Sequence, residues 1–487
     1  MSNPKTHSIW GHPRGLFTLF QTELWERFSY YGMRAILLLF LADSIINQGM
    51  GLDMQSAKAI VATYSASAFM LSILGGWAAD RLWGPLRATL YGGFIIISGH
   101  IVLSIPISET AYLGIILIAI GTGMLKPNIA TMVGSLYEDN DKRRDAGFSI
   151  FYMGINIGAL LAPLIVSYFR NVGGYHAGFI VAAIGMAIAL YFYLKGKGGF
   201  SKESDKVPNP ITAAERTKLL KRIGLLLIVL ILFWGTFRYG FNNTLVASIT
   251  NTLNLLSLIV PVGYFIMMFR SPQVTKAERS RLLALIPIFM TTAAYSMLFE
   301  QGGSSLIEFA VHGTQLDLGF MQISPEWYNS VNPLAIILLT GAFAYLWVKL
   351  NGKPSIPMKL AIGLGLVVIA FYYLGFTAQS YAEKNMLAPW WVLFVAYIIM
   401  TIGELCSSPV GYSAATLLSP KAFKSQGLAL WLMASAFGQA VAGIIFANVK
   451  LSMANNFIFF ASVGAIFTII LLALSPWTNR KIKEGLN

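Results

Sequence analysis

The sequence has little charge and almost no cysteine. Charged residues make up 11% of its 487 positions and hydrophobic residues 56%, and the mean hydropathy is +0.64. A soluble chain of this length carries more charge on its surface, so the composition excludes an ordinary soluble protein and predicts a membrane protein. The single cysteine, Cys406, excludes an internal disulfide bond and a thiolate metal cluster.

The sequence also lacks the short motifs of common enzyme active sites. Its five histidines are scattered, and neither GxSxG nor HExxH occurs, so we do not expect an enzyme or a metal site. The segment GTGMLK at 121–126 lacks the spacing of a phosphate-binding loop. The formal net charge is +14, but the basic residues lie in short loops between apolar runs. We therefore expect no nucleic acid partner.

Long apolar runs recur along the chain, and each is long enough to cross a bilayer as a helix. Because a spanning segment must satisfy its own backbone groups, we predict an all-α membrane protein with a lipid bilayer around it. The sequence predicts fourteen spans, at 16–43, 56–82, 87–107, 111–134, 147–169, 175–195, 223–240, 246–269, 281–302, 329–349, 356–377, 388–417, 424–448 and 455–476.

The spans fall into groups of six, two and six. We predict an N-terminal six-helix bundle at 1–195, cytoplasmic linkers with two additional transmembrane helices at 196–276, and a C-terminal six-helix bundle at 277–487. The linker sequence KGKGGFSKESDKVPNP is too polar to bury a core. Two six-helix halves are typical of transporters built from pseudo-symmetric repeats, with the substrate cavity near the middle of the membrane.

The distribution of basic residues predicts the orientation in the membrane. Most Lys and Arg residues fall in the loops and tails of one side, and the other side has only Lys58, Arg170, Arg238, Lys384 and Lys450. By the positive-inside rule, both termini are cytoplasmic. The polar first fifteen residues lack the apolar core of a cleavable signal peptide, so we expect insertion to depend on the first span.

The first span carries charges where contact with lipid would exclude them: Glu23, Glu26, Arg27 and Arg34. At 100° per residue, positions 23, 27, 30 and 34 share a narrow stripe, and Glu26 lies beside it. A charge at a helix centre costs about 2.5–3.5 kcal/mol, so the stripe must face partners or a wet cavity. A purely structural ion-pair lattice is the alternative, and it explains Glu23 with Arg27 better than it explains Arg34.

Three more deep charges lie in other spans: Lys126, Glu300 and Glu404. Together with the four in the first span they carry a formal net charge of minus one, which a single proton would neutralise. A zwitterionic peptide adds no net charge. A carboxylate that takes up a proton is therefore a candidate coupling site, driven in part by about 2.3 kcal/mol per charge per 100 mV of membrane potential.

Three spaced motifs resemble those of a known family. ELWERFSYYG at 23–32 resembles the ExxER motif of proton-dependent oligopeptide transporters. GGWAADRLWGPLR at 75–87 resembles the motif between the second and third spans of major facilitators, and FSIFYMGINIGAL at 148–160 resembles the family's fifth-span signature. The resemblance, to bacterial members of the family, runs from about Gly11 to the last span and implies the major facilitator fold with two extra helices.

The resemblance implies a proton-coupled symporter in the bacterial inner membrane, a plasma membrane, which imports di- and tripeptides by alternating access. Protons are the coupling ion and no cofactor is implied; we expect the chain to function as a monomer. The proton-coupling residues implied are Glu23, Glu26, Arg27 and Glu300. The substrate-binding residues implied are Arg34, Tyr30, Tyr31, Lys126, Asn156, Asn332, Glu404, Ser408 and Trp431.

Within that set the resemblance assigns separate roles. Arg34 and Lys126 attract the carboxylate of the peptide, and Glu404, with Asn156 and Asn332 nearby, holds its amino group. Glu300 binds the proton and pairs with Arg34. Before the resemblance is considered, Asn156 is equally well explained by packing, because a polar side chain in a Gly/Ala-rich span can simply bond a neighbouring helix.

Four positions depart from the family pattern. Phe69 replaces a pocket tyrosine, Ser296 a tryptophan and Phe299 an acidic residue, and Ser65 stands where animal members have a histidine. Because Ser65 replaces that histidine, proton binding is left to carboxylates. The first three put the side-chain pockets of the family in question for this chain.

Other polar residues have structural explanations. Asp80, Arg81 and Arg87 lie at the membrane edge, so we expect them to lock helix ends or to gate rather than to touch substrate. His100 and His176 are isolated, and a lone histidine is more often structural than a switch. Among other functions, a channel would need rings of like residues. The alternative that stays open is a proton-coupled facilitator for another small solute, such as an organic acid or a modified amino acid.

Overall fold

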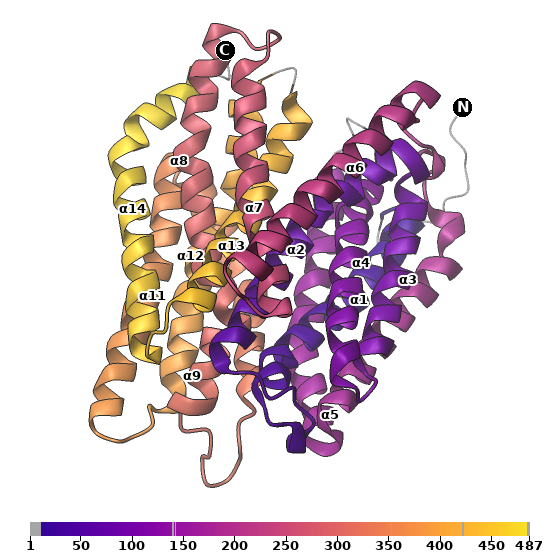
Figure 1. Ribbon diagram of the computed structural model, residues 1–487. Coiled ribbons are helices and arrows are strands. Elements are labelled where there is room, and N and C mark those ends of the chain that lie inside the picture. The colour runs from indigo at the N-terminus through magenta and orange to yellow at the C-terminus, as the bar shows by residue number, and fades with distance from the viewer. Residues whose placement is uncertain (1–10, 139–140, 142, 352, 421–422, 485–487) are drawn as a thin grey trace. The chain divides into compact units, whose positions relative to one another are not determined.

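The computed structural model describes residues 11–138, 141, 143–351, 353–420 and 423–484. This part of the chain is almost entirely helical, and its β pairing is limited to two isolated bridges (Figure 1). The predicted all-α class is confirmed. The α-helices are α1 Arg14–Ala42, α2 Met54–Ala78, α3 Pro85–Leu103, α4 Ser108–Gly134, α5 Arg144–Lys195, α6 Ala213–Gly235, α7 Leu245–Arg270, α8 Lys276–Phe299, α9 Ser305–Gly313, α10 Val331–Lys349, α11 Ile356–Glu383, α12 Trp390–Leu418, α13 Lys424–Asn448 and α14 Met453–Glu484.

Twelve helices in the described ranges are long and apolar enough to cross a membrane. The charges of α1 keep it out of that set, although its 29 residues suffice for a crossing. α5 is 52 residues long and contains a non-helical residue, Gly174, with φ of 79°, so it holds two of the predicted spans. With α1 added and α5 counted twice, the described part of the chain has the fourteen spans expected from the sequence.

The chain forms two compact units. The first comprises Met1–Asp53 and Ser67–Thr252, and the second comprises Met54–Ala66 and Leu253–Asn487. The division falls within α2 and within α7, so neither helix belongs wholly to one unit. The three-part division expected from the sequence, at 1–195, 196–276 and 277–487, stays a prediction.

In the first unit, α1 packs along α5 and α3 packs along α4 (Figure 1). The α1–α5 contact depends on the glycines of the 148–160 segment. A Cβ atom placed on Gly158 would lie 2.3 Å from the carbonyl oxygen of Leu24, so only glycine permits this approach. The segment that resembles a family signature is therefore a packing surface, and it seats the charged helix α1.

The polar segment between α5 and α6 lies along the turn that joins α2 to α3. Asn209 donates its backbone N–H to the carbonyl oxygen of Asp80 at 2.9 Å, and Ile211 donates to that of Arg81 at 3.1 Å. The turn itself, Ala79–Trp83, is a short π-helical stretch. Although its composition cannot bury a core, this segment finds backbone partners on the first unit.

Ion pairs add to the same contact. Arg81 lies 2.7 Å from Glu215 at the start of α6, and Arg87 lies 3.4 Å from Asp205 in the segment. Both pairs are partly or largely exposed to solvent, where an ion pair contributes little to stability. The structural or gating role expected for Asp80, Arg81 and Arg87 stays a prediction. The segment before α6 supplies backbone partners for Asp80 and Arg81 and an ion-pair partner for Arg87.

In the second unit, α11 packs against α12 and α14, and α8 packs against α13 and α14 (Figure 1). Large aromatic side chains fill the space between them. The ring of Phe457 meets those of Phe309 and Phe371 edge to face, with centroids 5.8 and 5.5 Å apart. All three rings are fully buried, and such pairs contribute about 0.5–1.5 kcal/mol beyond their buried area.

The first turns of α2 carry a lysine that the sequence analysis counted among the loop cations. That interpretation of Lys58 is wrong, because its side chain is only 1% exposed and its Nζ atom lies 2.8 Å from Oε2 of Glu308 on α9. The ammonium group also lies 5.1 Å from the ring centroid of Phe446. Its partner is 250 positions away in the sequence, so the sequence alone gave no sign of the pair.

We expect Glu308→Ala to destabilise the protein more than Lys58→Met. The first change leaves an ammonium group that is 1% exposed without its counter-charge, whereas the second leaves a carboxylate that is 14% exposed and nearer to water. Breaking a buried ion pair costs about 3–5 kcal/mol. Melting temperatures of the purified variants measure the difference. The double variant Lys58→Met with Glu308→Gln is expected to regain most of the loss; no recovery would show that the pair does not hold α2.

Candidate functional site

Three charged residues form a buried cluster on α1. Glu23, Glu26 and Arg27 are exposed by 2%, 1% and 2% respectively. Arg27 donates to both carboxylate oxygens of Glu26, with 2.7 Å from Nη2 to Oε1, and its Nε lies 3.4 Å from Oε1 of Glu23. The other oxygen of Glu23 has no hydrogen-bond partner in the described structure. Glu26 is thus the stronger partner of Arg27.

Two tyrosines predicted to bind substrate extend this cluster. The guanidinium carbon of Arg27 lies 4.7 Å from the ring centroid of Tyr30 and 6.0 Å from that of Tyr31. The two rings meet edge to face with centroids 5.2 Å apart. Arg34, one turn further along α1, is partly buried. The predicted residues of the first span therefore occupy one continuous stretch of helix.

Lys126 on α4 lies in the same unit. Its Nζ atom is 4.7 Å from the ring centroid of Phe69 on α2, which is a cation–π contact. Its charge also acts on Glu23. Phe69 is the residue that replaces a family tyrosine, so the aromatic ring beside this lysine carries no hydroxyl group.

Asn156 has a local explanation in the structure. Its Nδ2 atom donates to the carbonyl oxygen of Tyr152, one turn earlier on α5, at 2.9 Å. This bond lies within α5 and does not reach a neighbouring helix. The packing role and the substrate-binding role of Asn156 both stay predictions.

In the second unit, two residues predicted to act together are hydrogen-bonded. Asn332 on α10 donates from Nδ2 to Oε2 of Glu404 on α12 at 2.8 Å, and the same nitrogen lies 3.0 Å from Oγ1 of Thr401. Glu404 is close enough to Glu300 for their like charges to interact. Glu300 follows the last residue of α8 and begins a 3-10 turn, Glu300–Gly303. The two predicted carboxylates of this unit thus form one electrostatic group.

Sequence reasoning missed the polar neighbours of Ser296. Its hydroxyl group lies 2.9 Å from that of Ser435 on α13, and its carbonyl oxygen accepts from Nε2 of Gln439 at 2.6 Å. A serine in place of tryptophan therefore joins a hydrogen-bonded set. Trp431 is buried and packs on Gly411. The side chain of Ser408 lies outside the described residues.

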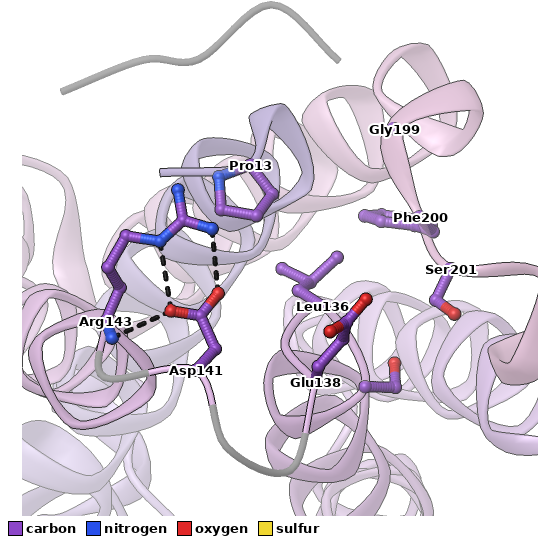
Figure 2. A pocket seen from close by; sticks show the side chains of 9 residues that line it. Pro13, Leu136, Glu138, Asp141, Arg143, Gly199, Phe200 and Ser201 are labelled. Atoms are coloured by element: carbon purple, nitrogen blue, oxygen red, sulfur yellow. Dashed lines mark hydrogen bonds and ion pairs between the residues drawn. The ribbon is translucent and has the colours of Figure 1, made fainter. Parts of the chain in front are cut away.

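A cavity of about 600 Å³ lies elsewhere in the first unit (Figure 2). The guanidinium group of Arg143 hydrogen-bonds Asp141 beside it and lowers the pKa of that carboxyl to about 2. The lining contains none of the residues predicted to bind peptide or protons. It consists of Pro13, Ser135, Leu136, Glu138, Asp141, Arg143, Gly199, Phe200 and Ser201.

Comparisons with known proteins decide the family. The sequence pattern of the POT family (PTR2) matches residues 86–465. The di-/tripeptide transporter of Lactococcus lactis subsp. cremoris is 38% identical over 97% of this chain and 96% of its own length. The chain belongs to the POT family.

Solved POT structures agree with this. A variant of the peptide transporter POT in complex with alafosfalin is 40% identical to the chain, with a TM-score of 0.89 over 98% of this chain and 97% of that one. A POT family transporter in complex with 5-aminolevulinic acid is 37% identical, with a TM-score of 0.91 over 97% and 98% of the two chains. The chain is a multi-pass membrane protein of a peptide transporter family and is not an enzyme.

We expect Glu26→Gln to destabilise the protein more than Glu23→Gln. Glu26 holds Arg27 through two hydrogen bonds, whereas Glu23 contacts it at 3.4 Å only. A hydrogen bond to a charged group contributes about 1.5–3 kcal/mol, so the first change leaves the buried guanidinium group poorly compensated. Melting temperatures in detergent measure both losses. Equal melting temperatures for the two variants would mean that Arg27 interacts equally strongly with Glu23 and Glu26, which would contradict the geometry described.

Proposed function

We propose that this protein is a proton-coupled symporter that imports di- and tripeptides by alternating access. The observation that carries the proposal is the set of charges within the spans, which contains cations for a peptide carboxylate and an anion for its ammonium group. Arg34 and Lys126 take the carboxylate, and Glu404, held by Asn332, takes the amino group. Both termini of a peptide are always charged, so fixed charges bind many sequences without reading their side chains.

Protons drive the cycle through carboxylates. Glu300 takes up the proton, and Glu23, Glu26 and Arg27 form the second proton-coupling group. The buried cluster on α1 supports this role, because the interaction of Glu23 with Arg27 is weaker than that of Glu26. The protein acts as a monomer with both termini in the cytoplasm, in accord with the basic residues of its loops.

A second candidate function is the transport of a peptide-like solute by the same machinery. It is favoured by the relative that was solved with 5-aminolevulinic acid. That molecule carries an amino group and a carboxylate at the two ends of a short chain, as a dipeptide does. The same cations and the same Glu404 would hold it, so the two candidates differ in the preferred ligand and share the site.

We expect Glu300→Gln to abolish proton-driven accumulation of dialanine in proteoliposomes while counterflow exchange survives. Glutamine cannot take up a proton, and exchange requires no net proton movement. Accumulation is expected to fall about tenfold or more, since an inward proton gradient can no longer be used. Labelled dialanine uptake with and without the gradient measures it.

The matched control is Glu383→Gln, which removes a carboxylate from an exposed position on α11 of the same unit. Normal accumulation is expected for this variant. Undiminished accumulation by Glu300→Gln would place the proton site elsewhere, with Glu23 the next residue to replace. Absence of gradient-driven dialanine uptake in the native protein, with uptake of 5-aminolevulinic acid, would select the second candidate.

We expect an amino-blocked dipeptide to lose more affinity with the native protein than with Glu404→Ala, because the variant has already lost the partner of the ammonium group. A charge-assisted hydrogen bond is worth about 1.5–3 kcal/mol, which corresponds to roughly 10–100-fold in affinity. Inhibition of labelled dialanine uptake by free and blocked peptides gives the four affinities of this cycle. The same penalty in both proteins would remove Glu404 from the amine site.

A further inference from the structure

The turn that carries Glu300 is tied to a neighbouring helix. The hydroxyl group of Tyr397 on α12 donates to Oδ1 of Asn329 at 2.9 Å and lies 3.4 Å from the carbonyl oxygen of Gly302, two residues after Glu300. Tyr397 is buried. Its hydroxyl group therefore bridges the 3-10 turn Glu300–Gly303 and the 3-10 turn Pro325–Ser330, which leads into α10.

The same polar chain continues to the proposed amine site. Asn329 precedes Asn332 by three residues, and Asn332 binds both Thr401 and Glu404. Tyr397, Thr401 and Glu404 are spaced four and three residues apart on α12, so they lie on one helix face. The hydroxyl group of Thr401 also donates to the carbonyl oxygen of Tyr397 at 2.7 Å. Hydrogen bonds and one short turn thus connect the Glu300 turn with Glu404.

The Glu300 turn and Glu404 are also linked electrostatically, because the charges of the two carboxylates act on one another. Other ionisable groups on the elements around the turn include Tyr295 on α8, Glu308 and His312 on α9, and Glu326 and Tyr328 before α10. Glu308 already binds Lys58, and Tyr328 donates to the carbonyl oxygen of Trp390. Direct charge repulsion alone would act through space and would not require Tyr397.

We propose that Tyr397 and Asn329 are positioning residues that couple the protonation of Glu300 to the geometry of the Glu404–Asn332 pair. The proposal rests on the proposed function, in which these two carboxylates serve the proton and the amino group. A buried hydrogen bond is costly to leave unmade. A change in charge at Glu300 that moves its turn therefore moves the Tyr397–Asn329 bond with it, and α10 transmits that movement to Asn332.

The test is Tyr397→Phe, alone and combined with Glu300→Gln. KM for dialanine is measured in proteoliposomes from about pH 5 to pH 8. We expect Tyr397→Phe to reduce the pH dependence of KM about threefold or more, and to change KM by less than about twofold once Glu300 is already glutamine. Non-additivity of this kind identifies coupling and distinguishes it from a loss of packing.

The matched control is Tyr372→Phe. It removes a hydroxyl group that lies 3.0 Å from Ser462, between α11 and α14 of the same unit. We expect this variant to keep the native pH dependence in both backgrounds. The proposal is overturned if Tyr397→Phe has the same pH profile as Tyr372→Phe, or if its effect is as large with glutamine at position 300 as without it.

A second readout needs no substrate and so separates this inference from the proposed function. Melting temperatures of the purified proteins are measured across the same pH range without peptide. We expect Tyr397→Phe and Glu300→Gln each to change how the melting temperature varies with pH, and Tyr372→Phe to lower it equally at every pH. If the native protein fails to accumulate dialanine, the proposed function is wrong. If the melting temperatures of Tyr397→Phe and Tyr372→Phe vary with pH in the same way, the coupling through Tyr397 is wrong.

Discussion

A charge placed inside a membrane span must keep a partner, and this constraint organises both units of the protein. In the first unit it explains why Arg27 and Glu26 lie in bidentate contact. In the second it explains the amide of Asn332 on Glu404. Lipid cannot replace these partners, because hydrocarbon solvates neither ion. The site and the packing of the helices around it are therefore parts of one arrangement.

The fold was largely predictable because its main signal is local. A run of about 20 apolar residues identifies a span whatever it later contacts, and all fourteen expected spans correspond to helical segments in the described ranges. Gly174 interrupts α5 between two of the expected spans. The sequence did not show that the polar segment before α6 would find backbone partners on Asp80 and Arg81. This pairing depends on contacts that no short window contains.

The residues of the candidate site could be predicted where they carry a charge within an apolar span. Charges such as Glu300 and Glu404 stand out in an apolar span, and the resemblance to POT transporters implies Asn332 as a neighbour of Glu404, which it contacts at 2.8 Å. Neutral polar residues were missed. Tyr397 was missed because a tyrosine in a span is normally interfacial or packed, and its distance of four and seven residues from Thr401 and Glu404 was the one signal available. Lys58 was misjudged because its partner is remote in sequence.

The contact between Lys126 and Phe69 sets how freely that lysine can change partners. A hydrogen bond to a tyrosine hydroxyl group has a preferred direction. The face of a phenylalanine ring offers a broad and shallow attraction in its place, worth about 0.5–2 kcal/mol, with no fixed direction. Phe69 carries no hydroxyl group, so its ring restrains the direction of the Lys126 ammonium group less than a hydrogen bond would.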